Sequence, residues 1–179
     1  MFGSSKKNDV QKAQESIDFK THRYQLEFDT SKGKITLDLW PDIAPNHVKN
    51  LLGLAKIGFY DRLTFHRIVP GFVIQGGCPE GTGTGGPGYH VDAEFNERKH
   101  EPGTLSMARA QYPNSAGSQF FLCLEKVPFL DRQYTAFGQT ADADSLAVVQ
   151  AIGKVKTGAG DRPVEDVVIK TATVLTHPL

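Results

Sequence analysis

Segment 65–77, FHRIVPGFVIQGG, places a cation and a neutral amide on either side of a Pro-Gly pair. Arg67 and Gln75 lie on two short predicted strands that flank Pro70 and Gly71. A two-residue turn would put their side chains on opposite faces, because side chains alternate along a strand. An odd-numbered loop centred on Gly71 would instead make them direct cross-strand neighbours. In that register a permanently charged hydrogen-bond donor and an orienting amide share one face.

Segment 117–124, GSQFFLCL, has a second face that suits a site. In a strand, one of its faces is wholly apolar, while the other mixes an amide with an aromatic ring. The apolar face fits a barrel interior, and an outward aromatic ring fits a binding groove. The apolar set is Phe120, Leu122 and Leu124, and the mixed set is Gln119, Phe121 and Cys123.

Other chemistries find weaker support. Residues 81–86, GTGTGG, match G-x-G-x-x-G, but Pro87-Gly88 follows at once and no helix opens there, so we interpret them as a glycine loop against a groove. The histidines are unevenly spaced and have no cysteine neighbours, so no metal site is expected. No nucleophile-elbow pattern surrounds the serines. The histidines in question are His66, His90 and His100, and the serines are Ser106, Ser115 and Ser118.

The totals indicate one globular domain. The 179 residues suffice for a hydrophobic core, and 39% apolar with 22% charged residues argues against disorder. Basic and acidic side chains number 20 each, so no broad nucleic-acid footprint is expected. With no long apolar run and no signal sequence, the chain is expected to be cytoplasmic and not membrane-bound. Cys78 and Cys123 are interpreted as free thiols, with a disulfide between them as the alternative.

The pattern of elements predicts a mainly β fold. Alternation predicts strands at 24–29 and 35–40 joined as a hairpin, and another at about 166–175. Apolar spacing predicts helices from Pro45 to Gly58 and at about 143–152; in the second, Asp142 or Asp144 is the cap. Its inward residues are expected to be Leu146, Val149 and Ile152. Residues 1–21 are expected to form a flexible leader before a single domain at 22–179, with a weak helical stripe of Val10, Ala13 and Ile17 as the alternative.

The chain resembles the cyclophilins, and the resemblance covers about residues 22–176. It is carried by FHRIVPGFVIQGG, by GTGTGGPG at 81–88, by LSMARA at 105–110, by GSQFF at 117–121 and by FLDRQYTAFGQ at 129–139. The order and spacing of these motifs also match. The resemblance implies a closed eight-stranded antiparallel β-barrel capped by two α-helices, with the active site on its outer surface. It also implies catalysed cis-trans rotation about X-Pro bonds without cofactor or metal.

The same resemblance assigns roles to individual residues. Arg67 would be the catalytic arginine, with Gln75 and Phe72 beside it. Phe72, Val73, Phe121 and Leu130 would line the proline pocket. Gln75, Ala108, Arg109, Ala110 and Gln119 would hold the substrate backbone. His66, Gly83, Phe129 and Tyr134 would complete the rim.

Several positions depart from the best-known eukaryotic pattern in ways usual among bacterial members. Phe129 stands where tryptophan is common, Tyr134 where histidine is common, Val73 for methionine and Arg109 for asparagine; the loop after Ala110 is one residue longer. Because Phe129 lacks an indole N–H, cyclosporin binding is expected to be weak.

Two functions remain to be compared. The first is a peptidyl-prolyl isomerase that assists protein folding and acts on proline-containing peptides and on unfolded or folded proteins. The second is a proline-peptide binding module or holdase with little turnover. A monomer is expected, because no spare apolar stripe is left for an interface.

Overall fold

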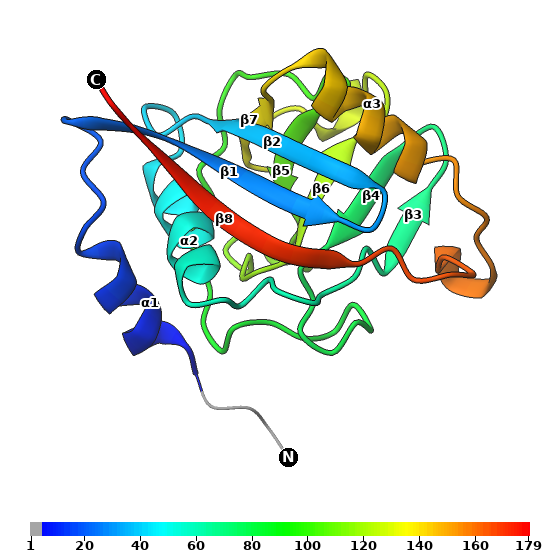
Figure 1. Ribbon diagram of the computed structural model, residues 1–179, viewed down its shortest axis with the longest axis horizontal. Coiled ribbons are helices and arrows are strands. Elements are labelled where there is room, and N and C mark those ends of the chain that lie inside the picture. Colours follow the sequence, from blue (N-terminus) through cyan, green and yellow to red (C-terminus); the bar gives the residue numbers. More distant parts are fainter. Residues whose placement is uncertain (1–4) are drawn as a thin grey trace.

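A single antiparallel sheet of eight strands dominates the computed structural model, which describes residues 5–179 (Figure 1). The strands occur in the order β3-β4-β6-β5-β7-β2-β1-β8. Their bounds are β1 His22–Thr30, β2 Gly33–Leu39, β3 Arg67–Val69, β4 Val73–Gly76, β5 Thr104–Met107, β6 Phe120–Cys123, β7 Ala136–Thr140 and β8 Ile169–Pro178. The α-helices are α1 Lys7–Gln14, α2 Pro45–Lys56 and α3 Ala143–Ile152, and the short 3₁₀ turns are η1 Pro128–Leu130 and η2 Ala159–Asp161.

The sheet curls into a half-barrel, so the expected closed barrel overstates its closure. The two outer strands, β3 and β8, share no continuous ladder. The residues just before each strand meet instead, through one bridge between Thr64 and Val168 and the Phe65 amide donating to the Val167 carbonyl at 3.0 Å. Because β3 has only three residues, it is too short to sustain a full seam.

The two predicted helices form where the sequence placed them. Pro45 occupies the first turn of α2, as its fixed φ allows, and Gly58 follows the helix with φ +75°. Asp142 caps α3 by accepting a hydrogen bond from the Ser145 amide at 2.7 Å. Of the α3 residues expected to face inward, Val149 and Ile152 are buried while Leu146 is half-buried.

The N-terminal segment differs from the expected flexible leader, because residues 7–14 form a third helix, α1. This helix packs beside α2 (Figure 1). Val10 is buried against Gly53, where a Cβ would lie only 2.8 Å from a Val10 methyl group. The missing side chain at Gly53 therefore makes room for α1. Residues 1–4 of the expected leader lie outside the described residues.

Two apolar clusters lie on opposite faces of the sheet. The main core fills the barrel and contains Phe120, Leu122 and Leu124. A smaller cluster joins Phe121 and Cys123 to three further residues, and Phe72, Ala108 and Tyr134 pack against it. Its other members are Val73, Val127 and Leu130. The predicted alternation of segment 117–124 is thus confirmed, and the smaller cluster marks the face where the site lies.

No helix within residues 5–179 has the length and apolar character that crossing a membrane requires.

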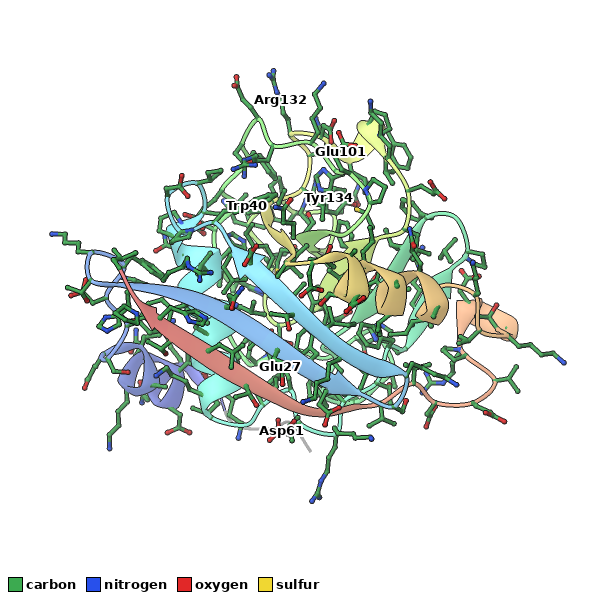
Figure 2. All side chains as sticks on the ribbon, turned by 45° about the horizontal axis from the view of Figure 1, so that its top comes forward. Glu27, Trp40, Asp61, Glu101, Arg132 and Tyr134 are labelled. Carbon is green, nitrogen blue, oxygen red and sulfur yellow. The ribbon has the colours of Figure 1, made fainter. Side chains whose placement is uncertain are left out.

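Figure 2 shows Tyr134 and Arg132 on the side of the molecule remote from Asp61. Asp61 connects the loop after α2 to strand β8, because its side chain accepts a hydrogen bond from the Ala172 amide at 3.0 Å.

Candidate active site

Arg67 and Gln75 are direct cross-strand partners in the β3–β4 hairpin. The last pair before the turn is Val69 with Val73, so the loop has three residues and Gly71 takes φ +73°. A positive φ of this kind suits glycine, which has no Cβ to clash. The odd-loop alternative is therefore the one that forms, and the Arg67 Nη1 donates to Gln75 Oε1 at 3.2 Å.

A chain of amide side chains continues from Arg67 across the sheet. The Gln75 Nε2 donates to Gln119 Oε1 at 3.1 Å. The Gln119 Nε2 in turn donates to the carbonyls of Gly83 and Gly85, each at 2.9 Å. Each amide both donates and accepts, so the chain fixes the direction in which the guanidinium points.

Arg67 lines a cavity of about 390 Å³. Its walls combine aromatic and aliphatic side chains with two cations, Arg67 and Arg109, so it can take an apolar ring beside a charged donor. All of its lining residues were candidate site residues from the sequence. They are Arg67, Phe72, Val73, Gln75, Ala108, Arg109, Phe121, Phe129, Leu130 and Tyr134.

Aromatic contacts hold the walls of this cavity. Phe121 meets Tyr134 edge to face, with ring centroids 5.7 Å apart. Phe129 lies stacked on Phe72 at 5.7 Å and keeps 71% of its surface exposed. An apolar ring left in solvent at the mouth of a cavity marks a surface that binds another molecule.

A second cavity of about 740 Å³ adjoins the first and shares Gln75, Ala108 and Arg109 with it. Its wall is the glycine loop, which confirms the interpretation of GTGTGG as a loop against a groove. Gly83, Ala110 and Gln119 were predicted for the site. No site role was predicted from the sequence for several further residues of its lining, namely Glu80, Pro87, Gly88, Tyr89, His90, Ser115, Gly117 and Ser118.

The comparison with known families decides the identity. The family model described as cyclophilin type peptidyl-prolyl cis-trans isomerase matches residues 25–174, which is most of the chain. The chain belongs to the cyclophilin family. Isomerisation of the peptide bond before proline is therefore its activity, and a binding module without turnover is not favoured.

Bacterial and structural relatives agree with this assignment. A peptidyl-prolyl cis-trans isomerase of Synechococcus elongatus is 54% identical over 128 residues, covering 72% of this chain and 88% of that protein. Peptidyl-prolyl cis-trans isomerase B of Bacillus subtilis is 49% identical over 124 residues, covering 68% and 86%. A Cryptosporidium parvum cyclophilin structure superposes with a TM-score of 0.81 at 32% identity, covering 88% of this chain and 99% of that one. That protein was also solved in the presence of the dipeptide Ala-Pro.

His66 is the one predicted rim residue that lines neither cavity of this cyclophilin. It is 6% exposed and lies behind Gly83, whose Cβ, if present, would be 3.4 Å from His66 Nε2. Burial lowers its pKa, and the nearby charges of Arg162 and Arg67 lower it further. The imidazole lies against the glycine loop, and its predicted place on the rim stays a prediction.

The Arg109 side chain is engaged within the cyclophilin fold. Its guanidinium donates to the Gln133 carbonyl at 2.8 and 3.1 Å and to the Ala110 carbonyl at 3.0 Å. It also lies over the Tyr134 ring, 4.6 Å from the centroid. The side chain therefore shapes the loop after Ala110, and the predicted role of Arg109 in holding substrate backbone stays a prediction.

Behind the smaller cavity, the buried side chains of His100 and Ser106 form an Asp131–His100–Ser106 arrangement with the half-buried Asp131. His100 Nδ1 contacts Asp131 Oδ1 at 3.0 Å, and His100 Nε2 contacts Ser106 Oγ at 2.8 Å. The order of groups resembles a hydrolase triad, but Ser106 is fully buried and no substrate reaches it. Burial lowers the His100 pKa even though Asp131 acts to raise it. His100 stacks on Phe121 at 6.0 Å and so supports the cavity floor.

Cys78 and Cys123 are both free and buried, so the disulfide alternative is not the arrangement found. The Cys78 sulfur accepts hydrogen bonds from the amides of Gly83 and Gly85 at 3.2 and 3.3 Å. Burial raises the pKa of this thiol, but those amides outweigh burial and the net shift is downward. Among residues 5–179 no cluster of three or more histidine, cysteine or carboxylate side chains is placed to hold a metal ion.

Proposed function

We propose that this cyclophilin accelerates X-Pro rotation by holding the pyrrolidine ring in the 390 Å³ cavity while Arg67 donates to the imide nitrogen. One observation carries the proposal. The guanidinium and the apolar walls formed by Phe72, Phe121 and Leu130 belong to one cavity, so a single bound proline meets both.

The chemistry needs a cation of this kind. Amide resonance sets a rotational barrier of about 18–20 kcal/mol, while the two X-Pro isomers differ by only about 1 kcal/mol. At the twisted transition state conjugation is lost, and the nitrogen becomes pyramidal and gains a lone pair. A donor aimed at that nitrogen binds the twisted form more tightly than the planar form, which lowers the barrier.

Arg67 supplies part of the acceleration. A charge-assisted hydrogen bond contributes roughly 1.5–3 kcal/mol, which corresponds to about ten- to hundred-fold in rate. The remainder is assigned to positioning and to removal of water from the imide. The Gln75 amide serves as a positioning group, because its contact with Arg67 at 3.2 Å holds the guanidinium toward the cavity.

The second cavity is proposed to receive the peptide chain beside the proline. Ala108, Ala110, Gln119 and Gly83 lie along it and offer backbone and amide groups to an extended segment. Phe129 and Tyr134 would cover the opposite side of the smaller cavity, the one proposed to hold the proline ring and called the proline-sized cavity. This division explains why polar lining belongs to the larger cavity and aromatic lining to the smaller one.

A two-dimensional NMR exchange measurement on an X-Pro peptide tests the proposal. The wild-type chain is expected to give cis/trans exchange cross-peaks, and Arg67→Ala is expected to lose most of this exchange while its amide spectrum stays that of the folded protein. Peptide shift changes without exchange in the wild type would favour the binding module. Full activity in Arg67→Ala would overturn the assigned mechanism.

We further propose the setting in which this activity operates. Proline-containing segments of unfolded and folded proteins would be the partners, and the activity would assist folding. The two free thiols support a reducing compartment, in agreement with a cytoplasmic location. The missing indole at Phe129 supports weak cyclosporin binding. A monomer is favoured by the small number of large apolar side chains exposed among the described residues.

A further inference from the structure

The glycine loop that walls the larger cavity is fixed from outside as well as from the groove. Arg162 Nη1 donates to the Gly81 carbonyl at 2.7 Å and so holds the start of the loop. Gln119 holds its middle through the carbonyls of Gly83 and Gly85. A loop so rich in glycine has much conformational freedom to lose, and therefore depends on such anchors.

The third anchor comes from the N-terminal segment. The Lys6 amide donates to the Pro87 carbonyl at 2.9 Å. The next loop residue, Gly88, has φ +89°, and a Cβ there would lie 2.7 Å from the Ser5 Cα. Ser5 therefore packs directly on the end of the loop. Ser5 and Lys6 both precede residues 25–174, the region that matches the family model.

Helix α1 fixes Lys6 in place, because Lys6 immediately precedes it. Val10 is 3% exposed at the α1–α2 contact. Gln14 Nε2 donates to the Lys49 carbonyl at 2.9 Å, and Lys56 Nζ donates to Ser16 Oγ at 3.0 Å. One apolar contact and two polar ones thus connect the segment to a helix that belongs to the domain.

These contacts form a continuous path to the reaction centre. The path runs from Lys6 to the Pro87 carbonyl, along the loop to Gly85, and from Gly85 through Gln119 and Gln75 to Arg67. Of these contacts, only the first lies outside the groove. A change at Lys6 therefore reaches the groove through the loop wall before it reaches the guanidinium.

We propose that Lys6 and α1 are positioning elements that hold the loop wall in its peptide-binding position. This inference rests on the proposed function of the larger cavity. A wall that is already ordered spares a bound peptide the cost of ordering it, which raises affinity. A peptide that fills only the proline-sized cavity does not touch this wall and gains nothing from the brace.

The backbone donor can be removed without changing α1. Lys6 precedes the first helical residue, so its amide is not used within the helix, and its φ of −87° lies near the proline range. Lys6→Pro deletes the bond to Pro87 and also places its ring Cδ against the Pro87 carbonyl, which lies 2.9 Å from the Lys6 nitrogen, so it separates the segment from the loop. Lys6→Ala keeps the amide and serves as the matched control. Both variants are compared on a blocked X-Pro dipeptide, which is the shortest substrate, and on an eight-residue peptide with residues on both sides of proline.

For the eight-residue peptide, Lys6→Pro is expected to raise KM about two- to tenfold with kcat unchanged. For the blocked dipeptide both constants stay at wild-type values, and Lys6→Ala matches the wild type on both peptides. Hydrogen exchange of the Gly85 and Gly88 amides should be faster in Lys6→Pro alone. Equal KM values for Lys6→Pro and Lys6→Ala on the long peptide would overturn the inference.

Gly53→Ala gives a second route to the same result. Alanine favours the α2 helix, but its Cβ would meet Val10 and displace α1. The same rise in long-peptide KM is expected, without loss of the domain fold. Gln119→Ala distinguishes a failure of the N-terminal brace from a failure of the peptide groove. If Gln119→Ala raises the long-peptide KM and the Lys6 and Gly53 variants do not, the brace fails and the groove stands; if Gln119→Ala also has no effect, the proposed groove itself fails.

Discussion

Arg67 lies directly opposite Gln75 in the β3–β4 hairpin, and its guanidinium donates to the Gln75 side-chain oxygen at 3.2 Å. The relationship depends on a three-residue loop, since adding or removing one residue would turn one of the two side chains to the other face of the sheet. Gln75 also contacts Gln119, so the cation is held by a chain of neutral groups. The charge on Arg67 thus stays available for a ligand.

Arg67→Lys is expected to lower kcat/KM by about tenfold or more although the charge is kept. An ammonium is a compact point charge and lacks the planar fork that reaches Gln75 and the cavity together. The measurement is catalysed exchange of an X-Pro peptide, with thermal unfolding as the control for fold. Wild-type kcat/KM in Arg67→Lys would show that charge alone is sufficient and that the fork geometry is irrelevant.

Phe120, in the main core, and Phe129, on the site face, should respond to alanine in opposite ways. Phe120 is fully buried in the main core, so Phe120→Ala is expected to cost about 3–5 kcal/mol of unfolding free energy. Phe129 is 71% exposed and lines the proline-sized cavity, so Phe129→Ala should change the unfolding free energy little and raise KM. Denaturant titration and peptide kinetics measure the two effects. A stability loss without a KM change in Phe129→Ala would contradict the placement of the cavity.

Features that depend on local pattern were predicted well from the sequence. The alternation in segment 117–124 separated Phe120 from Phe121 correctly, because a strand has a period of two residues. The positive φ of Gly71 and the cap at Asp142 also follow from local residue chemistry. The family motifs extended this to the residues lining the smaller cavity.

Features that depend on contacts distant in sequence were missed. The packing of α1 requires the missing side chain at Gly53, and no residue near Val10 in the sequence indicates that contact. The support of Phe121 by His100 joins segments that only the folded sheet brings together. In each case the decisive fact is a space or a ring contributed by another element, which no single window of sequence contains.

Isomerase activity is expected to stay nearly constant between about pH 6.5 and 8. Arginine keeps its charge throughout this range, so the proposed donor does not change. The nearest titratable ring, His66, has its pKa lowered by burial and by Arg162 and Arg67, so it stays neutral above pH 6.5. The check is kcat/KM for an X-Pro peptide across this range. A limb near pH 6.5 would point to a histidine acting in the reaction.

Stability, unlike activity, is expected to fall in acid, and Glu94 is one cause. Burial raises the Glu94 pKa, but hydrogen bonds from the His47 ring and from the amides of His47 and Asn46 outweigh it and lower the pKa below its ordinary value of 4.5. A lowered carboxyl pKa gives stability that is present above pH 4.5 and is lost as pH falls through the folded-state value. The buried ring of His100, whose pKa is lowered from 6.5, adds a decline that begins below pH 6.5.

Glu94→Gln tests this cause directly. The variant is expected to lose about 1 kcal/mol at pH 7, because Glu94 caps the start of α2, and to show a weaker decline below pH 4.5. Glu97→Gln is the matched control, since Glu97 makes only an exposed ion pair with Arg132 at 3.4 Å. Denaturant unfolding at several pH values measures both. If the unfolding free energies of the two variants depend on pH in the same way, Glu94 is not a cause of the acid decline.

Phe129→Trp is expected to bind cyclosporin about two- to tenfold more tightly than the wild type, the range that one hydrogen bond supplies. Position 129 lies on the rim of the proline-sized cavity and is largely exposed, so a larger ring fits there without repacking the core. The indole adds the N–H donor that phenylalanine lacks. Tyr112→Trp is the control, because Tyr112 is 65% exposed but lines neither cavity. Calorimetric titration should show tighter binding only for Phe129→Trp, with X-Pro kinetics close to wild type; equal affinity in all three proteins would mean that the missing indole does not limit cyclosporin binding.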